Sequence, residues 1–242
     1  MRVYIGFDDT DTSDASRGTG KLARLFEDRL PEGCSMWGVV RQQLLVHHAI
    51  PYTSHNSSAC AIVDMTDTSL LKPLINAAVE HIEHLSYEGS DPGLCVACEN
   101  GFARDRLIAF GQSCTAHIMS QREALQACTK VHLSAHGGTG DGIIGAAAAV
   151  GLTGYGWAGR FIEFGGLRRV PDVVRVSELA RLNILVVSID RNAKVPGPDD
   201  VVHTKQWLRP SLLAGRAVLM TTPRGNGVWE SLGEKRNKRI ST

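Results

Sequence analysis

Residues 1–22 read MRVYIGFDDTDTSDASRGTGKL, and this stretch decides the fold that we expect. Residues 2–7 alternate polar and apolar side chains and are rich in β-branched and aromatic types, which predicts a β-strand. A polar run and a glycine-rich turn follow, and Leu22 then opens the apolar spacing of a helix. Strand, turn and helix in this order are typical of an open α/β sheet, which places its ligand at the carboxyl ends of its strands.

Three acidic residues follow the strand at once: Asp8, Asp9 and Asp11. Carboxylates this close together repel one another unless a positive charge lies among them. A hard divalent cation is the usual partner of such an oxygen cluster. We therefore expect Asp8, Asp9 and Asp11 to hold Mg²⁺, directly or through water.

The turn RGTGK beyond the acids has the features of an anion site. The backbone N–H groups of Gly18 and Gly20, the helix dipole and Lys21 would all face a phosphate. Thr19 would contact or accept phosphate. Leu22 stands where a P-loop requires Ser or Thr, so this string is not that motif. Acids for a metal beside donors for phosphate predict a Mg-nucleotide site, with ATP as the cofactor.

The same residues also have a purely structural interpretation. Asp and Thr are common in turns after strands because their side chains cap turns and helices. The acids after the strand could then form a solvated loop without a ligand. Both interpretations remain open at the level of sequence.

A second glycine-rich stretch, residues 132–145, precedes an apolar, alanine-rich segment that predicts a buried helix. Gly137, Gly138 and Gly140 would let a backbone or a ligand approach closely, and Asp141 is the acid of this loop. We expect these residues to contact the nucleotide. The alternative is a tight turn packed against a sheet.

A polar loop at 47–56 carries His47, His48 and His55. Loops of this composition often carry function because a rigid scaffold positions them. The histidines could bind a transition metal in a hydrolase or ligase, although their spacing matches no common site. Contacts with substrate, and simple exposure to solvent, are equally open.

Composition bounds the class of protein. The chain has 242 residues, 43% hydrophobic and 21% charged, and a net charge of +1, which predicts no strong electrostatic affinity for nucleic acid or membranes. Residues 234–239 form a basic tail. The six cysteines show no spacing typical of a disulfide framework. The sequence also shows no signal segment and no apolar run of about 18–20 residues. These features predict a cytoplasmic protein with reduced thiols.

The remaining patterns predict the order of the elements. Pro, Gly and Asp punctuate the chain between them. We expect helices over 22–30, 70–85, 102–118, 122–128, 143–150 and 177–181, and strands over 36–45, 58–65, 94–97, 160–164, 184–189, 217–220 and 228–229.

Four motifs resemble the archaeal tRNA agmatidine synthetase family, whose members modify the anticodon cytidine of an isoleucine tRNA. They lie in the family's order and reach from residue 1 to about residue 230. The opening motif is the specific one. The four are VYIGFDDTD (3–11), SDPG (90–93), GTGDGIIGAAAAVG (138–151) and AVLMTTPRGNG (217–227).

The resemblance implies a kinase-like domain that binds ATP and magnesium, followed by a ferredoxin-like domain. It implies that Asp8, Asp9 and Asp11 organise magnesium, that Thr19 takes part in phosphate chemistry, and that Asp141 belongs to the second loop. From the sequence we expect no counterpart of that family's oligonucleotide-binding barrel and zinc ribbon.

We therefore expect an α/β (α+β) protein with a kinase-like domain over 1–130 and a ferredoxin-like domain over 131–242, where loop 136–145 could complete the first site. The expected activity is Mg-ATP-dependent phosphoryl or nucleotidyl transfer to an RNA nucleoside or a small molecule. The alternative is a non-catalytic nucleotide- or RNA-binding protein. We expect no membrane partner, and Tyr155 and Trp157 indicate a homodimer contact.

Overall fold

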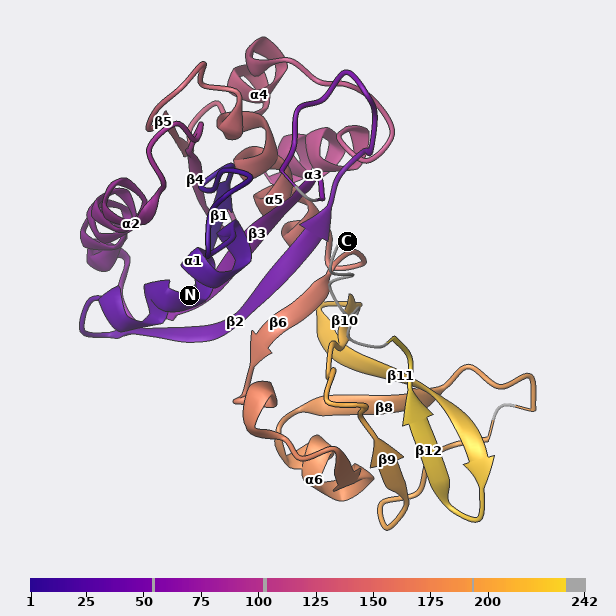
Figure 1. Cartoon of the computed structure of the whole chain (residues 1–242). Helices are drawn as coiled ribbons and strands as arrows, with labels where there is room; N and C mark the ends of the chain where they lie inside the picture. The colour runs from indigo at the N-terminus through magenta and orange to yellow at the C-terminus, as the bar shows by residue number, and fades with distance from the viewer. Residues whose placement is uncertain (54, 102–103, 193, 234–242) are drawn as a thin grey trace. The chain divides into compact units, whose positions relative to one another are not determined.

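The computed structural model describes residues 1–53, 55–101, 104–192 and 194–233, and the chain divides into two compact units, 1–162 and 163–242 (Figure 1). The expected mixed α/β class is confirmed. The division falls at 162/163 rather than at the expected 130/131. The reason is that the segment after residue 130 completes the sheet of the first unit and then covers it with a helix.

The sheet of the first unit has the strand order β5-β4-β1-β3-β2, and all of its neighbouring strands are antiparallel. The sequence had left the direction of these strands open. β1 is central, between β3 and β4. The strands are β1 (Arg2–Asp8), β2 (Cys34–Gln43), β3 (Ser57–Met65), β4 (Gly93–Cys98) and β5 (His132–Ala135).

Helices cover both faces of this sheet. Alternate residues of β1, namely Val3, Ile5 and Phe7, join a buried cluster with α1 (Thr19–Leu25) and α2 (Leu71–Leu85). The intervening residues face α5 (Gly142–Tyr155), as the period of two in a strand requires. Gly6 is needed there, because a Cβ would overlap the backbone of Ala146.

Several expected boundaries hold, and others differ. Asp67 accepts a hydrogen bond from the Ser69 amide at 2.7 Å in front of η2 (Thr68–Leu70), and Ser120 forms a capping box at the start of α4 (Gln121–Ala127). The helix expected over 102–118 is shorter, since α3 (Arg104–Ser113) ends at Ser113; residues 102 and 103 lie outside the described part.

Another difference concerns β5, which the sequence assigned to a glycine-rich stretch. β5 has only four residues, and it forms because it pairs with β4, a contact that no local pattern reveals. A 3-10 turn, η1 (Phe26–Arg29), extends α1 in place of the regular helix expected to residue 30.

The second unit is built mainly of short strands. Parallel pairs β8/β11 and β9/β12 lie beside antiparallel pairs β10/β11, β11/β12 and β7/β9. The sequence missed β7, β9 and β10, which have three residues each. The division falls within β6 (Arg160–Phe164). The elements beyond it are η3 (Leu167–Arg169), β7 (Val173–Arg175), α6 (Val176–Arg181), β8 (Ile184–Ser188), β9 (Val201–His203), β10 (Ser211–Leu213), β11 (Arg216–Gly225) and β12 (Val228–Ser231).

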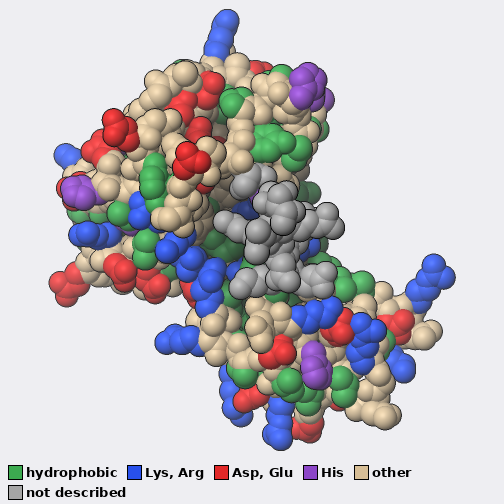
Figure 2. Space-filling view, in the orientation of Figure 1, with side chains coloured by type: hydrophobic (Ala, Val, Ile, Leu, Met, Phe, Trp, Pro, Cys, Tyr) green, Lys and Arg blue, Asp and Glu red, His purple; other side chains and the backbone are tan. Residues whose placement is uncertain are grey.

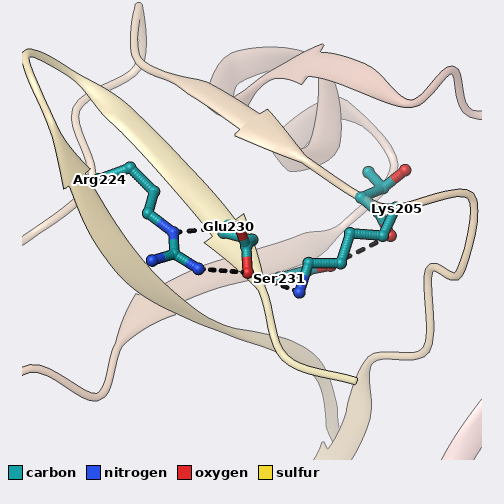
Figure 3. Close-up of polar contacts among 5 residues, drawn as sticks. Lys205, Arg224, Glu230 and Ser231 are labelled. Atoms are coloured by element: carbon teal, nitrogen blue, oxygen red, sulfur yellow. Dashed lines mark hydrogen bonds and ion pairs between the residues drawn. The ribbon is translucent and has the colours of Figure 1, made fainter. Parts of the chain in front are cut away.

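A charged cluster joins β11, β12 and the turn after β9. Arg224 binds the Glu230 carboxylate through two nitrogens, at 3.0 and 2.7 Å, and Lys205 Nζ lies 2.5 Å from the same carboxylate (Figure 3). The two cations lower the pKa of Glu230 to about 2. The cluster ties three segments of the second unit together.

The surface drawn in Figure 2 carries acidic and basic side chains interspersed, in keeping with the small net charge. All six cysteines have free thiols, as expected. In the described part of the chain, no helix is both long and apolar enough to cross a membrane. Tyr155 and Trp157 are exposed, and their role in a dimer stays a prediction. The basic tail lies outside the described residues.

Candidate functional site

A cavity of about 480 Å³ opens in the first unit where β1 ends. This volume lies in the range of pockets that bind small molecules and cofactors. The cavity gathers segments that are far apart in the sequence: the end of β1, the start of α1, the loop after β2, the segment from 114 to 122 and the start of α5. Five of the predicted site residues line it, namely Asp8, Asp9, Asp11, Thr19 and Asp141.

Asp8 is the last residue of β1 and points at α5. Its carboxylate lies so close to Gly145 that a Cβ at position 145 would overlap it. Burial, and next the charge of Asp9, raise the pKa of Asp8 to about 8. A bound cation would stabilise the ionised form of such a carboxylate, because it would offset both the cost of burial and the repulsion from Asp9.

Asp9 continues the acidic wall in a strained backbone conformation. Its φ of 48° lies in the left-handed region, which residues other than glycine rarely adopt. The Asp9 carbonyl accepts a hydrogen bond from the Asp91 amide at 3.1 Å, which holds this turn in place. Burial raises the pKa of Asp9 to about 6, with further contributions from the charges of Asp91, Asp11 and Asp141.

Thr19 connects the acidic turn to the first helix. Its hydroxyl accepts hydrogen bonds from the Thr10 amide at 3.3 Å and the Thr10 hydroxyl at 3.0 Å, and it donates to Asp11 Oδ1 at 3.3 Å. Thr53 donates to the other carboxylate oxygen of Asp11 at 3.4 Å. Thr19 is buried and yet lines the cavity, so these hydrogen bonds hold its hydroxyl in one orientation at the cavity wall.

Asp91 organises the second glycine-rich loop. Its carboxylate accepts hydrogen bonds from the Thr139 amide and hydroxyl at 3.1 and 2.5 Å, from the Gly140 amide at 2.7 Å and from the Asp141 amide at 3.1 Å. Burial raises the pKa of Asp91, but these hydrogen bonds outweigh it and the net pKa is lowered. The loop thus has a fixed shape at the entrance to α5.

The other predicted residues lie away from the cavity wall. Lys21 is exposed, and Gly20 packs beside Ile162. Gly18 lies near Asp11, while the second-loop glycines surround Asp91 and Gln121. The predicted residues that do not line the cavity are Gly18, Gly20, Lys21, Gly137, Gly138 and Gly140.

Sequence reasoning missed the opposite wall, where His117, Ser120, Gln121 and Arg122 line the cavity. Gln121 donates to Asp141 Oδ1 at 2.7 Å and to the Thr139 carbonyl at 3.0 Å, so α4 is tied to the second loop. No motif marks this segment. Ser120 has the residue type of a helix N-cap, which is the local feature that the sequence offers here.

The histidine loop contributes only in part. His55 lines the cavity, whereas the rings of His47 and His48 stack on each other with centroids 4.2 Å apart. Among the residues that the structure describes, no three His, Cys, Asp or Glu side chains are arranged to hold a metal ion together. The structure therefore gives no support to a transition-metal site in this loop.

The acidic wall fits magnesium better than a fully protein-bound metal. Mg²⁺ is usually held by one or two carboxylates, with water and substrate phosphate oxygens in the other positions. Asp8, Asp9 and Asp11 offer only oxygen donors, and burial, followed by the charges of neighbouring carboxylates, raises the pKa of the first two. These residues could hold the ion once phosphates complete its shell.

No protein-family model and no curated protein matches the chain. Several solved structures do match it. A tRNA fluorescent labelling enzyme is similar with 31% identity and a TM-score of 0.53. The complex of TiaS, a tRNA agmatidine synthetase, with tRNA and ATP has 30% identity and a TM-score of 0.53, and apo TiaS has 29% and 0.51.

Each of these alignments covers 62% of this chain but only 35–36% of the matched chain. The chain thus spans about a third of the length of the solved structures it matches. The likeness supports the resemblance to agmatidine synthetases that the sequence motifs indicated.

Proposed function

We propose that the first unit binds Mg-ATP and transfers a phosphoryl or nucleotidyl group to an acceptor, in chemistry related to that of the agmatidine synthetases. One observation carries the proposal: Asp8, Asp9, Asp11, Thr19 and Asp141, from three separate segments, line one cavity of about 480 Å³. A turn with only a capping role would not need to gather acids from two loops around a space of this size.

Asp8, Asp9 and Asp11 would hold the magnesium ion, in part through water. The bound ion would neutralise phosphate charge and so permit attack on a phosphorus atom. Gly145 supports this role, because it lets the helix approach the Asp8 carboxylate. Thr19, already hydrogen-bonded to Asp11, would contact or accept the transferred phosphate.

The phosphates also need donors and positive charge. Arg122 and His117 line the cavity, whereas Lys21 does not, so we assign the cationic role to Arg122 in preference to Lys21. The start of α5, where Gly142 lines the cavity, would add the partial positive charge of a helix N-terminus. Transfer of this kind depends chiefly on positioning and electrostatics, and it needs no activated nucleophile.

The comparisons suggest the class of acceptor. One similar structure is a complex of TiaS with tRNA and ATP, and another holds AMPCPP and agmatine with the tRNA. An RNA nucleoside is accordingly our first candidate, and a small molecule the second. The chain matches only about a third of TiaS, so RNA binding has to be tested directly.

Calorimetric titration of ATP with and without magnesium, into the wild type and Asp9→Asn, tests the proposal. We expect magnesium-dependent binding that the substitution abolishes. Incubation with ATP labelled at the α- or γ-phosphate then shows which group is transferred. Loss of the Asp9 carboxylate should lower turnover by about 10²-fold or more.

Asp105→Asn is the matched control, because the Asp105 side chain is 97% exposed on α3. It should bind and react like the wild type. Absence of ATP binding under both conditions would refute the proposal. Magnesium-dependent binding without any labelled product would instead favour a nucleotide-binding protein without catalytic activity.

A further inference from the structure

A second group of reactive side chains lies outside the cavity, at the edge strand β5. Ser134 Oγ lies 2.7 Å from His136 Nε2, and His136 Nδ1 lies 3.0 Å from Glu83 Oε1 on α2. His132 Nε2 lies 2.9 Å from the same Ser134 Oγ. The order carboxylate, imidazole, hydroxyl is that of the Ser-His-Asp/Glu constellation of acyl-transfer enzymes.

The chemistry of these side chains fixes which atom donates and which accepts in each hydrogen bond. A carboxylate only accepts, so His136 donates from Nδ1 to Glu83, and Nε2 of the neutral ring is left as an acceptor. Ser134 can then donate to His136 Nε2, and its oxygen accepts from His132 Nε2–H. Burial, with a smaller effect of His136, lowers the pKa of His132, which favours its neutral form. The four side chains thus have mutually consistent roles as donors and acceptors.

The group is separate from the nucleotide cavity. Ser134 pairs with Leu94 and His132 with Val96, and both partners belong to the core beneath α1 and α2. Directly opposed residues of an antiparallel pair point to the same face of the sheet. The hydroxyl therefore lies on the α2 face, whereas Asp8 faces α5 on the other side.

The group is also accessible and oriented. Ser134 is half-buried and the His136 side chain is 7% exposed, so the ring is held in place beside a residue that is partly open to solvent. The Glu83 side chain is 57% exposed and lies at the solvent-facing end of this group of side chains. β5 is the edge strand of its sheet, and a substrate can approach it without displacing another strand.

We propose that Ser134 is an activated nucleophile for an acyl group presented as a carboxylic ester. Ser134 Oγ would attack the ester carbonyl while its proton passes to His136 Nε2. The carbon–oxygen bond to the alcohol then breaks, and the alkoxide leaves with that proton. Water next attacks the acyl-serine, gives a proton to His136, and releases the acid as His136 returns the proton to Ser134. His132 Nε2–H could donate to the oxyanion.

In this scheme Ser134 and His136 are catalytic residues and Glu83 is a positioning residue. General-base assistance is worth about 10²–10⁴-fold. A free histidine on a protein surface also cleaves activated esters slowly, so ester turnover alone does not identify the serine. A probe that marks the nucleophile itself is required.

The test uses the full chain with a fluorophosphonate, which forms a serine–phosphorus bond and releases fluoride, followed by peptide mapping. We expect one adduct, on Ser134, and hydrolysis of p-nitrophenyl acetate that the adduct reduces to the slow rate given by free histidines. Ser134→Ala should prevent labelling, and His136→Ala should slow it at least 10²-fold. Glu83→Gln should lower kcat about tenfold without changing KM, and Glu83→Asp should restore part of it.

Ser113→Ala and His84→Ala are matched controls, since both lie outside the hydrogen-bonded group. They should label like the wild type. ATP titrations of the Ser134 variant separate this proposal from the nucleotide site, and they should be unchanged. Labelling scattered over other residues, or unaltered in folded Glu83→Gln and His136→Ala, would overturn it.

Discussion

The carboxylate of Asp8 lies directly against Gly145, so the start of α5 and the end of β1 meet with no room for a side chain between them. This contact brings an acid from residue 8 and a loop from residue 141 into one cavity. It also explains why glycine stands at this position of the helix.

Gly145→Ala tests this contact. The added methyl group should displace the Asp8 carboxylate, destabilise the protein by about 1–3 kcal/mol and abolish magnesium-dependent ATP binding. Urea unfolding and titration measure the two effects. Gly154→Ala, on the same helix, is the control: a Cβ there would meet Tyr4 at 3.8 Å, an ordinary contact, and it should be neutral or stabilise by up to about 1 kcal/mol. Equal behaviour of the two variants would contradict the prediction.

Asp8 should make the ligand-free protein less stable as pH rises. Its pKa is about 8 in the folded protein against an ordinary value of 3.8, so the folded state keeps a proton that the unfolded state releases between these pH values. Stability should fall through this window, and the raised pKa of Asp9 acts in the same direction.

Asp8→Asn cannot ionise and should flatten this pH dependence. At pH 8 the variant should be more stable than the wild type by about 1–3 kcal/mol, because it buries no charge. Thermal unfolding between pH 5 and 8 without metal is the measurement. A parallel decline in both proteins would show that Asp8 is not the group responsible.

Asp91→Asn tests the anchor of the second loop. The asparagine keeps the shape but loses the charge and one acceptor oxygen, so hydrogen bonds from Thr139, Gly140 and Asp141 should weaken. We expect a loss of about 1–2 kcal/mol in stability, faster amide exchange at 139–141 and weaker ATP binding. Asp105→Asn serves again as the exposed control. Unchanged exchange in that loop would rule out the anchoring role.

Glu230 should respond to acid in the opposite sense to Asp8. Its pKa of about 2 lies below the ordinary 4.5, so the stabilisation from Arg224 and Lys205 is complete above pH 4.5 and is lost as pH falls towards 2. Glu230→Gln should flatten the stability of the second unit over this range. Added salt should reduce the difference, since these charges are near the surface. An acid profile identical to that of the wild type would refute this assignment.

Most of the elements could be predicted from local pattern. The strand over 160–164 has the predicted bounds, and Asp67 and Ser120, residue types that favour N-caps, stand at helix starts. The short strands β5, β7, β9 and β10 could not be predicted. Three or four residues carry too little periodicity, and such strands exist only because a neighbour supplies their hydrogen bonds.

The candidate site could likewise be predicted only in part. The sequence alone identified the acids after β1, Thr19 and the acid of the second loop as candidate site residues. Their chemistry follows from residue type and close spacing. Only the folded arrangement shows that Arg122 and His117 complete the cavity, that Asp91 holds the second loop, and that His136 joins Ser134 to Glu83. These groups come from separate elements. The packing of α5 and α2 against an antiparallel sheet, and of α4 against α5, brings them together.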